Sequence, residues 1–324
     1  MKHKRAFSHC DVHNPFTMLD LHRLRLLLEL RERGTVGAVA AALGYSPSAV
    51  SQQLRVLERE AGVAVLERRG RRVALTEAGV VLARHAERLL TGVEEAEAEV
   101  AAVSGSVAGT VRISAFQTAT MTLVPPALTA LAARHPDLRV ELIEVEPEEA
   151  LSAIARQEID LVIADEWEYA PRPGHEGLLR EELLRERVRL VLPADHPLAA
   201  GGGAVALRDL AGAAWAGGRP PSAHDRMLQS ACRLLGGFTP DVRHRSTDLL
   251  VLFALVRSGH AVTLLPELAG GQADPTLALR DVAEGPLSRT VFTAVRAAAA
   301  RRPALQAVRA ALRDAAALSE PVAS

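Results

Sequence analysis

Apolar residues near the start of the chain recur every three or four positions, which is the spacing of amphipathic helices. Residues 21–33 predict a leading helix with three leucines on one face, namely Leu24, Leu27 and Leu28. Residues 36–59 predict two short helices joined by a tight Gly-Tyr-Ser turn. Gly44 suits the end of the first helix, Ser46 is placed to cap the second, and Pro47 suits its first turn.

The second helix of this pair has two differently built faces. Val50, Leu54 and Leu57 fall at i, i+4 and i+7 and can pack inward. The opposite face carries four hydrogen-bonding residues of a length that suits a DNA major groove, namely Ser48, Ser51, Gln52 and Arg55. The alternative is an ordinary helical hairpin whose polar side chains face water.

The flanking sequence favours DNA as the partner of this polar face. Residues 65–75, VLERRGRRVAL, predict a two-stranded wing with a tight turn at its Arg-Gly-Arg tip. Residues 18–75 carry ten arginines against six acids, a net charge of +4, whereas the whole chain carries −1. We therefore expect DNA contacts from the reading helix and the wing, by Ser46, Pro47, Ser48, Ser51, Gln52, Arg55, Arg68, Arg69, Arg71 and Arg72.

Residues 76–103 predict one long helix that links two domains. Residues three or four positions apart form a seam typical of a coiled coil, namely Leu82, His85, Leu89, Val93, Ala96, Val100 and Val103. Two-fold pairing would present two reading helices to successive major-groove faces, so we expect a homodimer or homotetramer. Packing of the seam against its own chain is the alternative. The small residues at 104–109, SGSVAG, predict a hinge.

Residues 110–300 alternate between strand and helix patterns, which is typical of a doubly wound α/β fold. The first lobe is predicted to contain strands at 111–114, 138–145 and 159–164 and helices at 118–134 and 148–157. A second lobe is predicted from 187–192, with helices at 223–235 and 248–258 and a strand at 261–265. The chain is expected to return to the first lobe through 276–281 and 287–295, and to end in a helix and tail at 301–324.

Several motifs follow one another in a characteristic order along the chain. In the amino-terminal part they are LHRLRLLLEL, GTVGAVAAALGYSPSAVSQQLRVLERE, residues 62–68 and LTEAG. Further on they are VRISAFQTA, LVPPAL, EIDLVIADE, LPADHPLA, GFTPDVRH and LVRSGHAVTLLP. In order and spacing they resemble the LysR-type transcriptional regulators. The resemblance implies an all-α winged helix-turn-helix DNA-binding domain, a linker helix, and a two-lobed α/β effector domain of the periplasmic-binding-protein kind.

The sequence differs from the residues usual in this family at three places. Pro47-Ser48 stands where many members have Gln-Pro, and Gln52 stands where many have Arg. Base preference therefore does not carry over from a relative. Gly259-His260-Ala261 stands where Gly-Leu-Gly is common, and the alanine predicts a turn without positive φ at that position or a slightly remodelled one.

The cleft between the lobes is the expected small-molecule site. Thr118 is expected at a helix amino terminus, which favours a carboxylate, and family members use a hydroxyl residue there. Simple capping of its own helix is the alternative. Asp165, Glu166 and Trp167 are expected just past the third strand, where two acids favour a zwitterionic or amine-bearing effector unless they merely face water. The candidate effector contacts are Phe116, Gln117, Thr118, Asp165, Thr247 and Asp248.

Composition narrows the function further. No apolar run approaches the roughly 20 residues needed to span a bilayer, and residues 1–17 lack the apolar stretch of an export signal, so a cytoplasmic protein is expected. Cys10 and Cys232 are too few and too separated for a disulfide framework. The only lysines are Lys2 and Lys4, which leaves the folded body without a phosphate-loop or Schiff-base lysine. We therefore expect a protein that is not an enzyme, needs no cofactor and does not contact a membrane. RNA polymerase is expected as a further partner.

Two other function classes share the predicted cleft. A solute-binding transport component would need an export signal, and an enzyme would need a nucleophile with a base or a metal cluster. His196 and His260 are isolated. The first seventeen residues contain candidate metal ligands, but their mixed, aperiodic composition predicts a disordered arm; those ligands are His3, His9, Cys10, Asp11 and His13.

Overall fold

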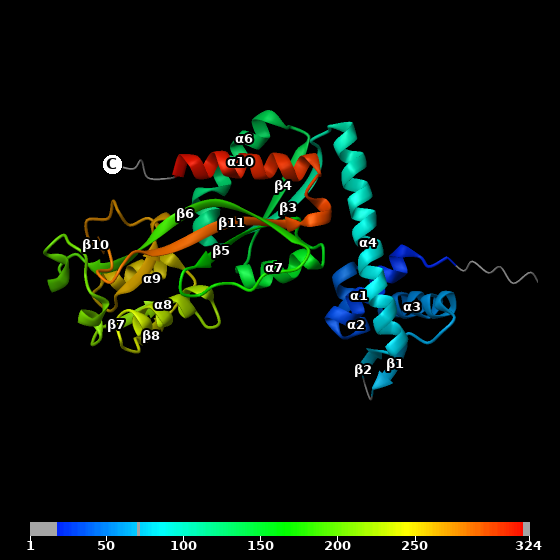
Figure 1. The fold of residues 1–324 in the computed structure, drawn as a ribbon, viewed down its shortest axis with the longest axis horizontal. Helices are drawn as coiled ribbons and strands as arrows, with labels where there is room; N and C mark the ends of the chain where they lie inside the picture. The colour runs from blue at the N-terminus through cyan, green and yellow to red at the C-terminus, as the bar shows by residue number, and fades with distance from the viewer. Residues whose placement is uncertain (1–17, 70–71, 320–324) are drawn as a thin grey trace, which may run out of the picture. The chain divides into compact units, whose positions relative to one another are not determined.

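The computed structural model describes residues 18–69 and 72–319, and the chain divides into two compact units, Met1–Ala96 and Glu97–Ser324 (Figure 1). The predicted arm over 1–17, with its candidate metal ligands, lies outside the described residues, as does Arg71 at the wing tip. No helix in the described ranges is long and apolar enough to cross a membrane.

The first unit contains the three predicted helices, α1 (Leu21–Arg33), α2 (Val36–Leu43) and α3 (Pro47–Ala61). Their apolar stripes meet in one core that includes Leu24, Leu27, Val39, Val50, Leu54 and Leu57. The predicted caps are confirmed: Gly44 ends α2 at φ 70°, and the Ser46 hydroxyl accepts the Ala49 N–H at 3.2 Å. These ends are fixed by neighbours within a few residues, which is why the sequence predicted them.

The predicted wing is a hairpin of β1 (Leu66–Arg69) and β2 (Arg72–Leu75), paired antiparallel. The carboxylate of Glu58, on α3, accepts the backbone N–H groups of Val65 and Leu66, both at 3.1 Å. The wing is therefore tied directly to the helix that is expected to read DNA, a contact that the sequence analysis did not include.

Helix α4 (Glu77–Ser104) begins at a tight junction with the wing. The Thr76 hydroxyl accepts the Gly79 N–H at 3.0 Å and donates to the Ala64 carbonyl at 2.8 Å. A Cβ at position 79 would lie 2.1 Å from the backbone oxygen of Val65, so only glycine fits there.

Three apolar residues of the predicted seam on α4 are exposed in the single chain. Leu89, Val100 and Val103 are 48%, 72% and 91% exposed.

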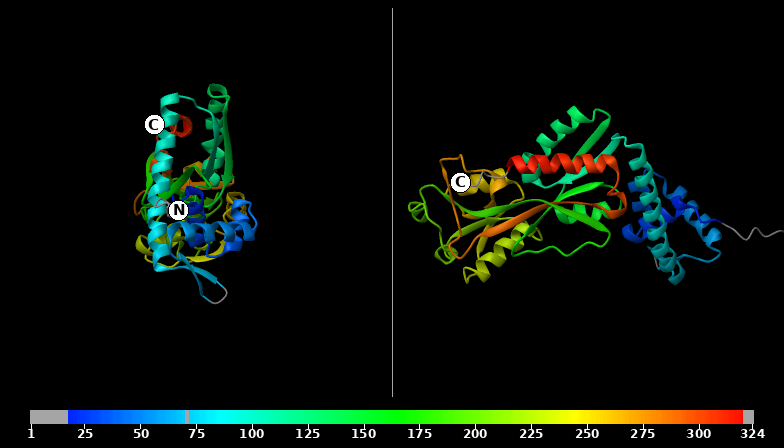
Figure 2. Two further views of the ribbon diagram at one scale, coloured as in Figure 1. Left: turned by 90° about the vertical axis from the view of Figure 1, so that its right-hand side faces the viewer. Right: turned by 45° about the horizontal axis from the view of Figure 1, so that its top comes forward.

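The first lobe of the second unit is built on a sheet in which β3 (Gly109–Ala115) pairs in parallel with β4 (Leu138–Glu144) and β5 (Leu161–Trp167). Helices α6 (Val124–Arg134) and α10 (Pro303–Ser319) pack together against one face, and α7 (Pro147–Ala155) packs with β5 on the other (Figure 2). The helix predicted at 301–324 is thus an integral part of this lobe's core.

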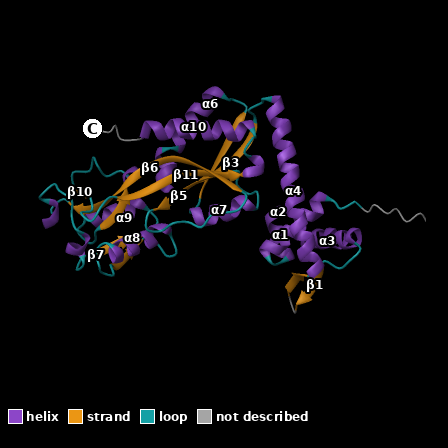
Figure 3. Cartoon of the chain, viewed as in Figure 1, coloured by secondary structure: helices purple, strands orange, loops and turns teal. Residues whose placement is uncertain are grey.

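Two long antiparallel strands, β6 (Leu178–Pro193) and β11 (Leu287–Arg296), run side by side between the lobes (Figure 3). The far end of β6 pairs with β9 (Thr263–Pro266) and β10 (Leu277–Arg280). The second lobe adds a small parallel pair, β7 (Ala214–Gly217) and β8 (Asp241–Arg245), with helices α8 (Ala223–Leu234) and α9 (Leu249–Arg257). Short 3₁₀ turns lie at Pro197–Ala199, Leu207–Leu210, Glu267–Ala269 and Ala297–Ala299.

The structure corrects the predicted helix over 118–134. It is two helices, α5 (Gln117–Thr122) and α6, because Pro125 and Pro126 have no N–H to continue the hydrogen bonds of a preceding turn. The prediction for Ala261 is confirmed, because positive φ occurs at Gly259 and not at the alanine.

Three predictions about strands were also inexact. Strand β5 continues to Trp167, so Asp165 and Glu166 lie inside it rather than past its end. Strand β10 stays in the second lobe, and only β11 returns to the first. Strands β7 and β8 were not predicted, since each is only four or five residues long.

Candidate DNA interface and effector cavity

Helix α3 buries one face and leaves the other open. Val50, Leu54 and Leu57 are at most 1% exposed, whereas the side chains of Ser48, Gln52 and Arg55 are exposed and Ser51 is half-buried. Ser46 and Pro47 form the first turn, and the hydroxyls of Ser46 and Ser48 lie 3.0 Å apart. The side chains of Gln52 and Arg55 make no hydrogen bond or ion pair with any described residue, so all their side-chain donors are available to a ligand.

The arginines of this unit fall into two groups. Arg23, Arg31 and Arg33 are ion-paired to Glu60, Glu87 and Glu29 respectively. Arg55, Arg59 and Arg68 are exposed and have no such partner among the described residues. Arg25 on α1 and Arg84 and Arg88 on α4 also lack an ion pair with any described residue, so the uncompensated positive charge is spread over α1, α3, α4 and the wing. Of the other predicted wing contacts, Arg69 and Arg72 face each other across the hairpin, with side chains outside the described part of the structure.

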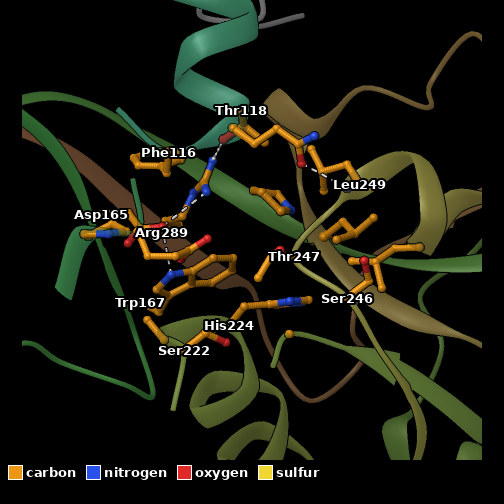
Figure 4. Close-up of a pocket in the computed structure, with 18 of the residues that line it drawn as sticks. Phe116, Thr118, Asp165, Trp167, Ser222, His224, Ser246, Thr247, Leu249 and Arg289 are labelled. Carbon is orange, nitrogen blue, oxygen red and sulfur yellow. Dashed lines mark hydrogen bonds and ion pairs between the residues drawn. The ribbon is translucent and has the colours of Figure 1, made fainter. Parts of the chain in front are cut away.

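A small cavity of about 80 Å³ lies between the two lobes of the second unit (Figure 4). The first lobe contributes Phe116, Gln117, Thr118, Glu146, Asp165 and Arg172, and the second contributes Ser222, His224, Ser246, Thr247, Leu249 and Leu265. Trp167 on β5 and Arg289 on β11 complete the lining.

Arg289 lies beside Phe116, Asp165 and Trp167 in the lining of the cavity and is only 2% exposed (Figure 4). Strand register places it opposite Trp167 on β5 and opposite Glu186 on β6. Its guanidinium donates to Glu186 at 2.9 Å and to the Thr118 hydroxyl at 2.9 Å, and it lies 5.0 Å from the Trp167 ring. Charge-assisted bonds and a cation–π contact thus hold one buried cation in place.

Asp165 is shared by two buried arginines. It accepts from Arg172 at 2.8 Å and from Arg289 at 3.3 Å, and the Trp167 indole N–H donates to it at 3.0 Å. Glu166 is paired with Arg180 at 2.9 Å. Both predicted acids are therefore paired with arginines of the chain, Asp165 in the interior and Glu166 in a half-buried pair, and neither is a free anionic group for an effector.

Thr118 lies in the first turn of α5, at a helix amino terminus as predicted, and binding of an anion there stays a prediction. Thr118 is the second residue of a helix of six residues whose N-cap is Phe116, so it does not cap that helix. Its hydroxyl is instead bound by Arg289. The alternative of simple capping is wrong as well, because the side chain points to another element.

Two bridges close the cavity by joining the lobes. The Gln117 side chain accepts the Leu249 N–H at 2.9 Å and donates to Asp248 at 3.3 Å. On another side, Glu148 of α7 pairs with Arg226 of α8 at 3.2 Å. Asp248 caps α9 and does not line the cavity, whereas Thr247 does.

Two lining groups have shifted acidity. Burial lowers the pKa of His224, and nearby Arg289 lowers it further, so the ring is neutral at pH 7. Its Nε2 lies 2.8 Å from the Leu264 carbonyl, which can only accept, so Nε2 carries the proton and Nδ1 is left as an acceptor. Burial raises the pKa of Glu146, and the negative charges of Asp165 and Glu148 raise it further.

Two family models match the chain in the order that the fold requires. The bacterial regulatory helix-turn-helix protein model of the lysR family matches residues 21–80, and the LysR substrate binding domain matches residues 104–317. The chain belongs to the LysR family. It is a DNA-binding transcriptional regulator with an effector-binding domain, and not an enzyme.

Individual LysR-family proteins resemble the chain over most of its length. The transcriptional dual regulator GltC of Bacillus subtilis (strain 168) is 27% identical over 84% of this chain and 89% of its own. A probable hydrogen peroxide-inducible genes activator of Mycobacterium xenopi is 33% identical over 54% of this chain and 90% of its own. Full-length CbnR complexed with its target DNA shares the fold at 21% identity, with a TM-score of 0.52, covering 92% of this chain and 99% of that one.

The cavity of this LysR regulator depends on residues that the sequence analysis did not select, namely Glu146, Arg172, Ser222, His224, Ser246 and Arg289. Arg289 had a local signal. In the sequence LSRTV the alternation of a strand puts it on the same face as Leu287 and Val291, which are both buried. A charged residue at an inward position requires a buried partner of opposite charge.

Proposed function

We propose that this LysR regulator reads a promoter through the outer face of α3 and grips the phosphates through its wing. A single observation carries the proposal: Gln52 and Arg55 are exposed and unpartnered among described residues on a helix whose other face is fully buried. DNA in the major groove supplies acceptors and donors for such side chains. The DNA complex of the structurally similar CbnR supports the same kind of partner.

The direct test is binding of the full chain to a fragment from upstream of its own gene. Fluorescence anisotropy is measured in the presence of a large excess of scrambled duplex at moderate ionic strength. Retained binding to the upstream fragment supports the proposal. Equal affinity for the scrambled duplex contradicts it.

Replacing Gln52 with alanine is expected to relax base preference at one base pair by about 1–3 kcal/mol. Competition against operators that vary at single positions measures this loss. Gln53→Ala is the matched control, because the neighbouring Gln53 points inward and accepts from Arg23 at 3.2 Å. It should leave base preference unchanged. If Gln52→Ala weakens all duplexes equally, Gln52 is not a reader.

Replacing Arg68 with alanine is expected to weaken binding to all sequences alike, because a guanidinium on phosphate carries no base information. The slope of log affinity against log salt concentration should become shallower by about 1. Arg139→Ala removes an equally charged side chain, 75% exposed, from the second unit and should change neither quantity. An unchanged salt slope in Arg68→Ala would show that Arg68 does not contact a phosphate.

Oligomerisation through α4 belongs to the same proposal. The exposed apolar residues of its seam, Leu89, Val100 and Val103, would be covered by a second copy. Light scattering at micromolar concentration distinguishes a homodimer or homotetramer from a monomer. An oligomer presents two reading helices to a near-palindromic site.

Effector control is proposed to act through closure of the two lobes. The bridges from Gln117 to α9 and from Glu148 to Arg226 form only when the lobes are together. The two lobes are proposed to be in equilibrium between a more open and a more closed arrangement. A ligand that binds one arrangement more tightly shifts this equilibrium, and the paired reading helices change position with it. We propose that the outcome is altered access of RNA polymerase to the promoter, in the cytoplasm.

Thiol chemistry is not part of the proposal, although a relative is named as a peroxide-inducible genes activator. Cys232 is fully buried on α8. Burial raises the pKa of its thiol to about 12, so the reactive thiolate is scarce at neutral pH. We infer a structural role for this cysteine.

A further inference from the structure

Glu58 lies on the same side of α3 as two of the proposed reading residues. Positions 51, 55 and 58 are related as i, i+4 and i+7, so Glu58 follows Ser51 and Arg55 along one row of the helix. A carboxylate on this row repels the phosphates of a duplex that α3 approaches. The acid therefore opposes DNA binding unless its charge is compensated within the protein.

The compensation comes from the base of the wing. One carboxylate oxygen of Glu58, Oε1, accepts the backbone N–H groups of Val65 and Leu66, both at 3.1 Å. Val65 is fully buried, and Leu66 is the first residue of β1, where it pairs with Leu75 of β2. The two hydrogen bonds thus attach the first residues of the hairpin to the last turn of α3.

A second attachment ties the hairpin base to α4. The Val65 carbonyl accepts the Thr76 N–H at 3.0 Å, and apolar residues of both strands pack against the core of the unit. Apolar packing is non-directional, whereas a hydrogen bond depends on angle as well as distance. The bonds to Glu58 therefore fix the direction in which the hairpin leaves α3.

We infer that Glu58 is a positioning residue for DNA binding, which sets the wing at a fixed angle to α3 so that Arg68 reaches a phosphate while α3 lies in the major groove. The inference rests on the proposed use of α3 and the wing. Arg68 is exposed and lies two residues beyond Leu66 on the same strand. A rotation of the hairpin about its base therefore moves the guanidinium away from its phosphate.

Replacing Glu58 with alanine removes both hydrogen bonds to the hairpin. Binding to the upstream fragment is expected to weaken about tenfold, the value of one charge-assisted bond. The slope of log affinity against log salt concentration should become shallower by about 1, as in Arg68→Ala. Base preference should be kept, because α3 retains its cap at Ser46 and its buried face. Fluorescence anisotropy of the full chain, with competition by operators varied at single positions, measures all three.

Glu58→Gln separates the hydrogen bonds of this side chain from its charge. The amide oxygen accepts the same two N–H groups, whereas the negative charge is lost. Binding is expected to be retained or to become up to about threefold tighter. Loss of the charge alone would make both variants bind more tightly. Weaker binding in Glu58→Ala together with retained binding in Glu58→Gln is therefore specific to positioning.

Glu77→Ala is the matched control for loss of an acid. Glu77 is an exposed residue in the first turn of α4, and its side chain makes no hydrogen bond to the part of the hairpin that the structure describes. Its removal should leave affinity within about threefold of the original protein.

A double variant tests whether Glu58 acts through Arg68. In Glu58→Ala the guanidinium has already lost its phosphate, so adding Arg68→Ala should weaken binding by no more than about twofold further. Additive losses, a Glu58→Gln variant as weak as Glu58→Ala, or an unchanged salt slope in Glu58→Ala overturns the inference. Loss of base preference together with the slope overturns it as well, because an unfolded first unit gives that result.

The original protein and Arg68→Ala, measured alongside, keep this inference apart from the proposed function. If the original protein does not prefer the upstream fragment, the proposed function fails and the inference fails with it. A shallower salt slope in Arg68→Ala beside an unchanged slope in Glu58→Ala counts against positioning by Glu58 alone.

Discussion

Replacing Arg289 with methionine is expected to lower the free energy of unfolding of the second unit by about 3–5 kcal/mol. Arg289 is 2% exposed and compensates Glu186 and Asp165, which are 7% and 5% exposed. Methionine fills similar space but leaves two buried carboxylates facing a single remaining buried arginine, Arg172. The loss of protection should be largest in the neighbouring strands β5, β11 and β6.

Urea unfolding followed by circular dichroism measures this effect, with hydrogen exchange to locate it. Arg301→Met is the matched control, because Arg301 is 73% exposed and its pair with Glu99 is at the surface. Adding Glu186→Gln to Arg289→Met should restore part of the loss by removing one uncompensated charge. A loss no larger than that of Arg301→Met, or no recovery in the double variant, would show that the pair is not a unit.

Replacing Gly79 with alanine is expected to cost the first unit about 1–3 kcal/mol through forced displacement of the wing junction. The added Cβ would lie 2.1 Å from the Val65 backbone oxygen and 3.2 Å from the Leu75 Cβ. Val65 is where the wing is anchored by Glu58, so DNA affinity should fall with stability.

Gly92→Ala is the control, because it lies in the same helix with open space around it. An alanine there removes the entropic cost of glycine and should stabilise the helix by up to about 1 kcal/mol. The two substitutions are therefore expected to have opposite signs in thermal unfolding of the full chain. Equal effects would show that the Val65 contact relaxes without cost.

The first unit could be predicted almost residue by residue. Helices α1 and α3 begin where the sequence predicted, and the caps at Gly44 and Ser46 form as expected. The inward positions Val50, Leu54 and Leu57 are buried. The link from Glu58 to the wing was not predicted, because nothing in the spacing of a glutamate tells which N–H groups it will meet seven residues later.

The position of the cavity between the lobes was predicted, but the hydrogen-bond and ion-pair partners of its lining residues were not. Thr118 and Asp165 do line it, yet both are occupied by arginines of the same chain. Reading Asp165 as a free acid assumed that β5 ended before it. The strand continues to Trp167, and burial of an acid within a strand then demands an internal counter-charge.

The sequence by itself determined the local features of the first unit, namely its helices, their caps and the wing, and its motifs identified the family. Periodicity and capping involve residues within one or two helical turns, so they can be predicted from the amino-acid sequence. The site was decided by tertiary structure, since Arg289 meets Glu186, Asp165 and Thr118 across 103, 124 and 171 residues of chain. Those meetings depend on strand register, which fixes that Arg289 lies opposite Glu186 and Trp167.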